Sequence, residues 1–405
     1  MKFFKNIMYK NFFVLIFLFL KFIRLFLKTN IPSGIIFASK NIKHISCVKI
    51  KYSKYYCTSN KKILKLTYEK NIFPENKKKI IENYIIKTSN SKNFSIQNGY
   101  FFYKSFFFFE KAVPFLKSQL KKNLLNFNNY LDSKNFMRNN FKKIYFKKLH
   151  TPKKNYNTVI NLSTHNNTSY FHWLIQPSLQ TISLIKNFNK IKLNSYFYIN
   201  SIYKNNLPSF VKETLKVLKI KKEQLIYENC TSKNFYCLYQ NNQYNLVNKD
   251  HVFFLRKIFL KKKIISKNTN PYIYISRKFS NRGLRNDDEI YNFLKIKYNF
   301  KRVFLEKLSL NNQIKTFHNA KIIIATHGAG SANIVFCKKN ISIFEIFPDN
   351  NFSNMSIYNI SKILNINYGY ILGSKLFYDN NFLVNIQKIK DFLEMQKVKD
   401  LLLCK

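Results

Sequence analysis

The chain has 405 residues, of which 46% are hydrophobic, and its formal net charge is +51, from 70 lysines and arginines against 19 acidic residues. This length suits two or three domains, and the hydrophobic share is ample for their cores. The six cysteines form no Cys-x-x-Cys pair and no cluster with histidine. That pattern argues against a disulfide framework or a zinc site and favours a cytoplasmic chain.

The positive charge has two explanations. Taken alone, it points to nucleic acid, a membrane surface or phosphate-bearing ligands. Lysine, asparagine, isoleucine, phenylalanine and tyrosine are all abundant, however, and their codons are rich in A and T, so a mutational bias toward A and T is the alternative explanation for most of the lysine. A nucleic-acid-binding protein is expected to concentrate arginine, whereas lysine dominates here.

Residues 1–30 form a basic and apolar segment. The unbroken apolar run from Phe12 to Leu20 is shorter than the roughly 20 residues that span a bilayer. Lys21, Arg24 and Lys28 follow at helical spacing among large apolar side chains. We therefore expect an uncleaved helix that lies on an anionic membrane surface. A cleaved signal peptide is the alternative, although no small-residue cleavage site follows the run.

Residues 31–150 show no clear periodicity. Their most distinctive feature is the aromatic block GYFFYKSFFFFEKAVPF at 99–115. Apolar runs of this length usually fill cores, so we expect the block to be buried; a membrane-facing patch is the alternative.

Residues 151–265 show a faint alternation of strands and helices. Apolar residues keep helical spacing between Phe171 and Ile185, and Pro177 must kink or start a helix there. A further helix is expected over 208–220, and strands are expected at 158–162, 196–200 and 224–228.

The alternation is far more regular over residues 266–380. Continuous apolar runs predict strands at 271–276, 302–306, 321–326, 341–347 and 368–372. Helices are expected over 287–298, 310–320 and 355–364, with a short one after the glycines near 330. Asn286 and Glu289 resemble a capping box at the start of the first of these helices. Residues 381–405 are expected to form a terminal helix.

Strands that alternate with helices, several of them continuously apolar, indicate an α/β fold with parallel sheets covered on both faces. Crossovers of this kind are right-handed, which predicts two Rossmann-like domains, one over 151–265 and one over 266–380. Two such halves in one chain suggest a cleft between them.

The stretch ATHGAGSANIVF at 325–336 places a Gly-x-Gly turn between an apolar strand and a helix start. Glycines let the backbone approach a ligand closely, and unpaired N–H groups at a helix start attract anions. His327 stands at the same turn, where an imidazole at the carboxyl edge of a parallel sheet faces the ligand. A tight turn without a ligand is the alternative, since neither a P-loop nor a GxGxxG pattern is present.

Other polar residues follow neighbouring strands and are expected at the same edge. Arg277 ends the first strand of this half, Arg282 and Arg285 lie in the loop after it, Glu306 ends the second strand, and Glu345 lies in the strand after the glycine turn. Arginines there would hold a diphosphate, and a carboxylate would accept ribose hydroxyls. Surface charges without a ligand are the alternative for each arginine alone.

A second constellation lies in SYFHWLIQPSL at 169–179, which contains the only tryptophan beside His172. On a helix, His172, Gln176 and Gln180 share one face. A catalytic histidine and a core histidine bonded to a carbonyl remain equal alternatives on this pattern.

Together these blocks resemble glycosyltransferase family 61, over about residues 150–370. SYFHWLIQPSL is similar to the family's Asn-Tyr-x-His-Trp-Leu-x-Glu segment, and YISRKFSNRGLRNDDEI to its Tyr-Ile-Ser-Arg block. FLEKLSLNNQIKTFHNAKIIIATHGAGSANIVF resembles the family signature, in which Glu-x-x-Ser and a glutamine-containing helix precede His-Gly-Ala-Gly-x-x-Asn.

The resemblance implies a GT-B-like fold, in which two Rossmann-like domains face a cleft, and an inverting transfer from a nucleotide-sugar donor. It implies no cofactor and no metal, so we interpret the acids at 287–289 as helix N-terminal charges. It further implies phosphate contacts from Arg277, Arg282, His327 and the backbone of Gly328 and Gly330, and nucleoside or sugar contacts from Glu306, Asn333 and Glu345.

The sequence departs from the family pattern beside His172. The family's acidic residue four positions later is Gln176 here, and its asparagine three positions earlier is Ser169. Glutamine cannot act as a base. Deprotonation of the acceptor then falls to His172, which we choose, or to a carboxylate from elsewhere, or the chain is catalytically weakened.

The leading hypothesis is a glycosyltransferase of surface polysaccharide biosynthesis, peripheral on the cytoplasmic face of the cell membrane, with a glycan or lipid-linked acceptor. One alternative is a weakened member that binds nucleotide sugars as a scaffold. A basic nucleic-acid-binding protein is the other, and the scattered lysines count against it.

Overall fold

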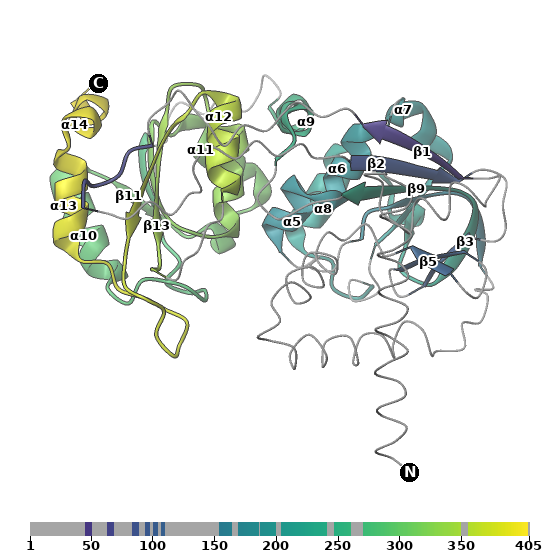
Figure 1. Cartoon of the computed structure of the whole chain (residues 1–405), viewed down its shortest axis with the longest axis horizontal. Helices are drawn as coiled ribbons and strands as arrows, with labels where there is room; N and C mark the ends of the chain where they lie inside the picture. The colour runs from purple at the N-terminus through teal and green to yellow at the C-terminus, as the bar shows by residue number, and fades with distance from the viewer. Residues whose placement is uncertain are drawn as a thin grey trace, which may run out of the picture.

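The computed structural model describes residues 45–50, 63–68, 83–88, 94–97, 100–103, 107–109, 154–163, 169–185, 187–199, 204–240, 247–260, 270–349 and 355–403. The expected membrane-surface segment at 1–30 lies outside these residues. Figure 1 shows one sheet in each half of the molecule, with helices from both halves between the two sheets. Within the described part, no helix combines the length and apolar character needed to cross a membrane.

The sheet of the C-terminal half is wholly parallel. Its strands lie in the order β11-β10-β12-β13-β14. In chain order this is 2-1-3-4-5, a doubly wound arrangement with a switch point beside the first strand. The parallel α/β sheet predicted for this half is confirmed. The strands are β10 (Tyr272–Ile275), β11 (Lys301–Val303), β12 (Ile322–Thr326), β13 (Ser342–Phe347) and β14 (Asn367–Leu372).

Both faces of this sheet are buried, and β12 shows why its sequence is continuously apolar. Ile322 and Ile324 pack in one hydrophobic cluster, whereas Ile323 and Ala325 pack in the other. Successive strand side chains point to opposite faces, so a strand with two covered faces needs apolar residues at every position. In Figure 1, α10 (Asp287–Tyr298) and α13 (Ile386–Glu394) cover one face, and α11 (Leu310–Asn319) and α12 (Ser356–Leu364) cover the other.

The helix expected over 287–298 forms within the predicted bounds, but its capping box does not. The side-chain amide of Asn286 donates to Glu289 Oε2 at 3.1 Å and to the carbonyl of Val384 at 2.8 Å, and makes no cap bond to its own helix. The expectation was wrong because Oδ1 of Asn286, the acceptor that a cap needs, accepts the N–H of Val384 at 3.3 Å.

The C-terminal end also differs from the single helix expected. It forms α13 and a separate α14 (Gln396–Leu403). Met395 between them leaves the helical conformation, with ψ at 132°.

The sheet of the first half is mixed. β6 (Asn155–Asn161), β7 (Tyr196–Tyr198), β8 (Leu225–Ile226) and β9 (Cys230–Gln240) run parallel. Strands from the region without periodicity join β9 antiparallel, so residues before and after 150 share one sheet. The side chains of the aromatic block at 99–115 are not among those described, so its expected burial stays a prediction. The strands that the region before residue 150 adds to this sheet are β1 (Ile45–Ile50), β2 (Asn83–Thr88), β3 (Phe94–Gln97), β4 (Tyr100–Tyr103) and β5 (Phe107–Phe109).

Pro177 divides the helical segment that follows β6. Helix α5 (Tyr170–Ile175) ends at Gln176, whose backbone is extended, and α6 (Pro177–Leu184) starts at the proline. Proline lacks an N–H and disfavours helical backbone in the preceding residue, so it starts the second helix, as expected. The other helices of this half are α7 (Phe188–Ile191), α8 (Ser209–Val217), α9 (Lys249–Phe259) and the 3-10 turns η2 (Lys192–Asn194) and η4 (Lys222–Gln224).

The two halves share one hydrophobic cluster, which runs from β6 and α6 to β12, β13 and the 3-10 helix η7 (Ala329–Phe336). Arg256 of α9 donates from Nη1 to the carbonyls of Val335 and Cys337, at 2.7 and 2.6 Å. The carboxylate of Glu213 accepts the N–H of Leu310 at 3.1 Å and so caps α11 from the other half. A cleft between the two halves stays a prediction.

One segment crosses from the N-terminal region to the C-terminal sheet. Leu64 donates its N–H to the carbonyl of Tyr368 and accepts the N–H of Tyr370, both at 3.0 Å. Leu64 and Leu66 are buried in the same cluster as α10 and α13. Residues 63–68 therefore line the outer edge of β14.

Candidate functional site

The predicted site residues of the C-terminal half lie where the parallel strands end. Arg277 follows β10, Glu306 lies in the turn η6 (Leu305–Lys307) after β11, and His327 follows β12. Because these three strands are parallel neighbours, their carboxyl ends form one edge.

Arg277 is the most constrained charged group at this edge. Its Nη2 donates to the carbonyl of Asn281 at 2.7 Å, while its buried Nε has no acceptor among the described residues. Burial, then the charge of Arg282, lowers the pKa of Arg277 to about 10, against an opposing effect of Glu306. Burial also lowers the pKa of Arg282, whose backbone is left-handed with φ at 64°. Two partly desolvated guanidiniums and one unmet donor make this edge short of negative charge.

Arg285, in the same loop, faces elsewhere. Its Nε donates to Asp379 Oδ2 at 3.3 Å, and its guanidinium lies 3.9 Å from the ring centre of Phe377. The structure thus separates the three arginines of this loop: Arg277 and Arg282 are electrostatically coupled, and Arg285 holds the 377–379 hairpin.

The two glycines of the turn are required for close approach. A Cβ atom at Gly328 would lie 1.9 Å from Nη1 of Arg277, and one at Gly330 would lie 2.4 Å from Cδ1 of Leu305. Gly328 is extended, with φ at −178°, so space and not backbone strain demands glycine there. The guanidinium of Arg277 therefore rests on the backbone of the turn.

Replacing Gly328 with alanine is expected to move the Arg277 guanidinium, because the new methyl group meets the far end of that flexible side chain. We expect nucleoside diphosphate binding to weaken about tenfold through misplaced charge-assisted hydrogen bonds, with little loss of thermal stability. Calorimetric titration and melting curves measure the two effects. Gly330→Ala meets an apolar side chain instead and should weaken binding less; equal losses in both variants would contradict this role of Arg277.

His327 and Glu345 form a buried pair. Nδ1 of His327 donates to Glu345 Oε1 at 2.9 Å, and the hydroxyl of Tyr368 donates to Oε2 at 2.8 Å. The imidazole stacks on Phe347 with ring centres 4.4 Å apart. Burial, followed by the charge of Glu345, raises the pKa of Tyr368 well above its usual value. Because both carboxylate oxygens are engaged, Glu345 orients His327 in this structure, and its predicted contact with nucleoside or sugar stays a prediction.

Asn333 is likewise engaged by protein groups. It is fully buried, and it bonds Tyr170, Gln313 and the carbonyl of Gly330. Its predicted contact with the donor also stays a prediction. Of the predicted ligand contacts, Glu306 is exposed at the edge beside Arg277.

His172 lies on α5, half-buried, and its Nδ1 is in close contact with Oε1 of Gln176. A carbonyl oxygen only accepts, so this contact assigns the proton to Nδ1 and the lone pair to Nε2. Burial lowers the pKa of His172, and the bond to Gln176 opposes the shift less strongly. The lowered pKa favours the neutral imidazole, the form that a general base requires.

A different histidine takes the structural role that the sequence left open for His172. Nε2 of His251, on α9, lies 2.8 Å from the carbonyl oxygen of Leu174, and burial lowers its pKa to about 4. His251 is thus the core histidine bonded to a carbonyl.

The structure brings the two predicted constellations into contact, because α5 packs against η7. Sequence reasoning singled out neither Tyr170 nor Gln313, although both lie inside the motifs that carry the family resemblance. It also missed Ser331, whose buried hydroxyl has no partner among the described residues.

The acidic residues at the start of α10 bond other side chains of the protein. Asp287 is buried and accepts from Tyr274 at 2.6 Å, Ser276 at 2.8 Å and Arg302 at 3.1 Å. Within the described part of the chain, no group of three histidine, cysteine or acidic side chains is placed to hold a metal ion. The expectation that catalysis needs no metal stays a prediction.

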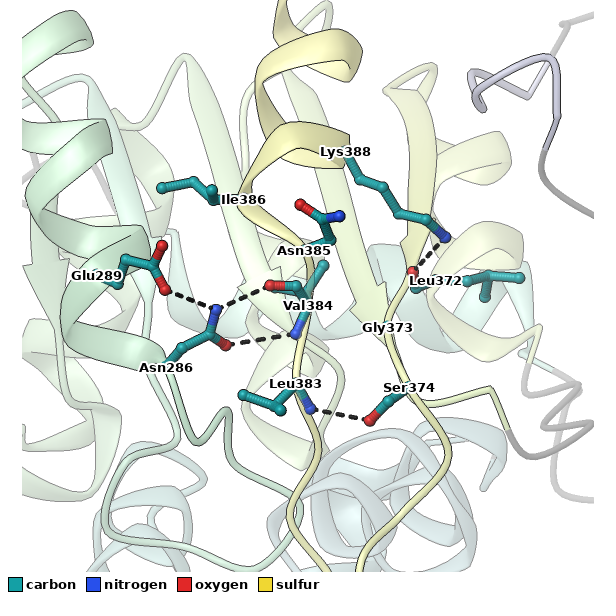
Figure 2. A pocket seen from close by; sticks show the side chains of 10 residues that line it. All are labelled: Asn286, Glu289, Leu372, Gly373, Ser374, Leu383, Val384, Asn385, Ile386 and Lys388. Atoms are coloured by element: carbon teal, nitrogen blue, oxygen red, sulfur yellow. Dashed lines mark hydrogen bonds between the residues drawn. The ribbon is translucent and has the colours of Figure 1, made fainter.

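A surface hollow of about 500 Å³ lies between the start of α10, the end of β14 and the start of α13 (Figure 2). Its polar side chains bond one another or nearby backbone: Lys388 donates to the carbonyl of Leu372 at 3.0 Å, and Ser374 accepts the N–H of Leu383 at 3.0 Å. None of the predicted site residues lines it.

The fold is α/β, and two arginines lie beside a glycine turn at the carboxyl edge of its parallel sheet. Residues 42–344 match the family described as Glycosyltransferase 61, and the chain belongs to that family. It is also similar to the EGF domain-specific O-linked N-acetylglucosamine transferase of Drosophila melanogaster, with 36% identity over 76 residues. That match covers 18% of this chain and only 15% of the relative. The family resemblance drawn from the motifs is confirmed.

Proposed function

We propose that this chain transfers a sugar from a nucleotide-sugar donor to an acceptor hydroxyl with inversion at the anomeric carbon. The observation that supports it most is the buried Nε of Arg277, which has no acceptor among the described residues and lies on a guanidinium packed against Gly328. A diphosphate supplies the negative charge and the acceptor oxygens that this edge lacks.

In the proposed reaction, Nε2 of His172 takes the proton from the acceptor hydroxyl as its oxygen attacks the anomeric carbon. The bond between that carbon and the phosphate oxygen breaks, and the nucleoside diphosphate leaves with the electron pair. Arg277 and Arg282 stabilise the negative charge on the leaving group, as a metal ion does in other enzymes. A GT-B-like cleft between the halves would bring acceptor and donor together.

We further propose that the acceptor is a glycan or a lipid-linked glycan of surface polysaccharide biosynthesis, and that residues 1–30 hold the enzyme at the inner face of the cell membrane. The basic and apolar character of that segment supports this location. The similar Drosophila protein is named as an N-acetylglucosamine transferase, so nucleotide-activated N-acetylglucosamine is the first donor to test.

A panel of nucleoside diphosphates and nucleotide sugars, screened by thermal shift and then by donor hydrolysis, tests the function. We expect at least one nucleotide sugar to raise the melting temperature and to be hydrolysed slowly without an acceptor. Stabilisation without any turnover would favour the scaffold alternative. Absence of stabilisation by every nucleotide would refute the proposal, and affinity for DNA or RNA that falls steeply with salt would favour a nucleic-acid-binding protein.

A further inference from the structure

Three polar side chains from different elements, of which Asn333 is fully buried and the other two partly buried, form a continuous hydrogen-bond chain between the two halves. The hydroxyl of Tyr170, on α5, donates to Oδ1 of Asn333, on η7, at 2.6 Å. Nδ2 of Asn333 donates to Oε1 of Gln313, on α11, at 2.8 Å. We call these three residues the amide relay.

Every amide hydrogen of the relay has a partner. The two hydrogens of Asn333 Nδ2 go to Gln313 and to the carbonyl of Gly330 at 3.0 Å. The two hydrogens of Gln313 Nε2 go to the carbonyls of Leu305 and Leu308, at 3.0 and 3.2 Å. A buried network in which each donor is used specifies one arrangement of the elements that it joins. An aspartate at 333 would set an acceptor against two carbonyl oxygens, so the chemistry requires an amide.

The partners of the relay are the parts of the proposed site. The carbonyl of Gly330 belongs to the glycine turn, and the carbonyls of Leu305 and Leu308 flank Glu306. Tyr170 stands two residues before His172 on a helix of 6 residues, and its ring packs edge-on against Phe210 with centres 5.3 Å apart. A displacement of the tyrosyl hydroxyl would therefore move the helix that carries the proposed base relative to the turn that holds the donor.

We propose that Tyr170, Asn333 and Gln313 are positioning residues, which hold His172 in register with the anomeric carbon of a donor bound at the glycine turn. This inference rests on the proposed function for its catalytic consequence. The structural coupling itself is measurable without a substrate.

The test uses Tyr170→Phe, which removes one hydroxyl and keeps the ring, with Tyr272→Phe as the matched control. Tyr272 also makes one tyrosyl hydrogen bond, to the carbonyl of Leu402 at 3.2 Å, but it begins β10 at the opposite end of the strand from Arg277. In the ligand-free protein, we expect Tyr170→Phe to speed amide hydrogen exchange about tenfold in both 170–175 and 330–336. The control should change neither segment. Unchanged exchange, or a change confined to α5, would overturn the inference whether or not the protein binds a nucleotide sugar.

Steady-state kinetics then separate positioning from binding. We expect Tyr170→Phe to lower kcat about tenfold while the donor KM stays within about twofold, because the donor site keeps its own contacts. Asn333→Gln, which keeps an amide but misplaces it, should show the same split. A raised donor KM with unchanged kcat would assign the relay to ligand binding instead. A wild-type protein without turnover would refute the proposed function, and the exchange result would still decide whether the relay couples the two elements.

Discussion

Arg277→Ala is expected to weaken nucleoside diphosphate binding by about 2 to 3 kcal/mol, or roughly 30- to 150-fold, because charge-assisted hydrogen bonds to phosphate are lost. The guanidinium lies on Gly328, its Nε has no protein acceptor among the described residues, and burial lowers its pKa to about 10. A largely desolvated charge with an unmet donor destabilises the free protein. The same variant should therefore melt at a temperature no lower than the wild type.

Arg285→Ala is the matched control, since it removes the same side chain from the same loop. Arg285 has its own partners in Asp379 and Phe377, so its loss should lower stability slightly and leave binding unchanged. Isothermal titration with a nucleoside diphosphate, together with melting curves, measures both properties. Equal affinity for Arg277→Ala and wild type would refute the phosphate site.

His172→Ala is expected to lower kcat by about 10²- to 10⁴-fold, the usual contribution of a general base, while donor binding is retained. The reason is geometric: Nδ1 contacts the side-chain oxygen of Gln176, which places the proton on Nδ1 and the lone pair on Nε2. Burial lowers the pKa of His172 below 6.5, and protonation removes the lone pair that the base needs. The wild-type kcat/KM should therefore stay level near pH 7 and fall only as the pH drops through that lowered pKa.

Gln176→Glu provides the complementary test of the base. A carboxylate at 176 would accept the same Nδ1 hydrogen, raise the pKa of His172 and increase its basicity. We expect a higher kcat and an acid limb shifted to higher pH. If Gln176→Glu left the pH profile in place, or if His172→Ala kept full turnover, another group would have to be the base.

The C-terminal half was readable from the sequence because its signals are local. Ile322 to Ile324 form a continuous apolar run, which only a strand buried on both faces requires, and parallel neighbours bring Arg277 and His327 to one edge. Pro177 likewise fixes its own helix start, since the missing N–H acts on adjacent residues.

Features that depend on residues remote in the chain could not be predicted from the sequence. Asn286 has the spacing of a capping box, yet its Oδ1 accepts the N–H of Val384. The sequence placed Arg285 at the same edge as Arg277, but it did not reveal that Asp379 and Phe377 engage its guanidinium. Strands β1 to β5 show no periodic signal in the sequence, and two of them, β2 and β3, are joined to the sheet by pairing with β9, far along the chain.

The segment at 63–68 has a consequence for how this protein can be made and divided. Leu64 fills the edge of β14 from about 300 positions earlier in the chain, so the C-terminal sheet is complete only when an early segment remains available to it. During synthesis that segment leaves the ribosome long before its partner strand, and closing so long a loop slows folding. The C-terminal half is therefore not an interchangeable module: fragments that begin after residue 150 would carry an open strand edge and two missing core leucines, which favours aggregation.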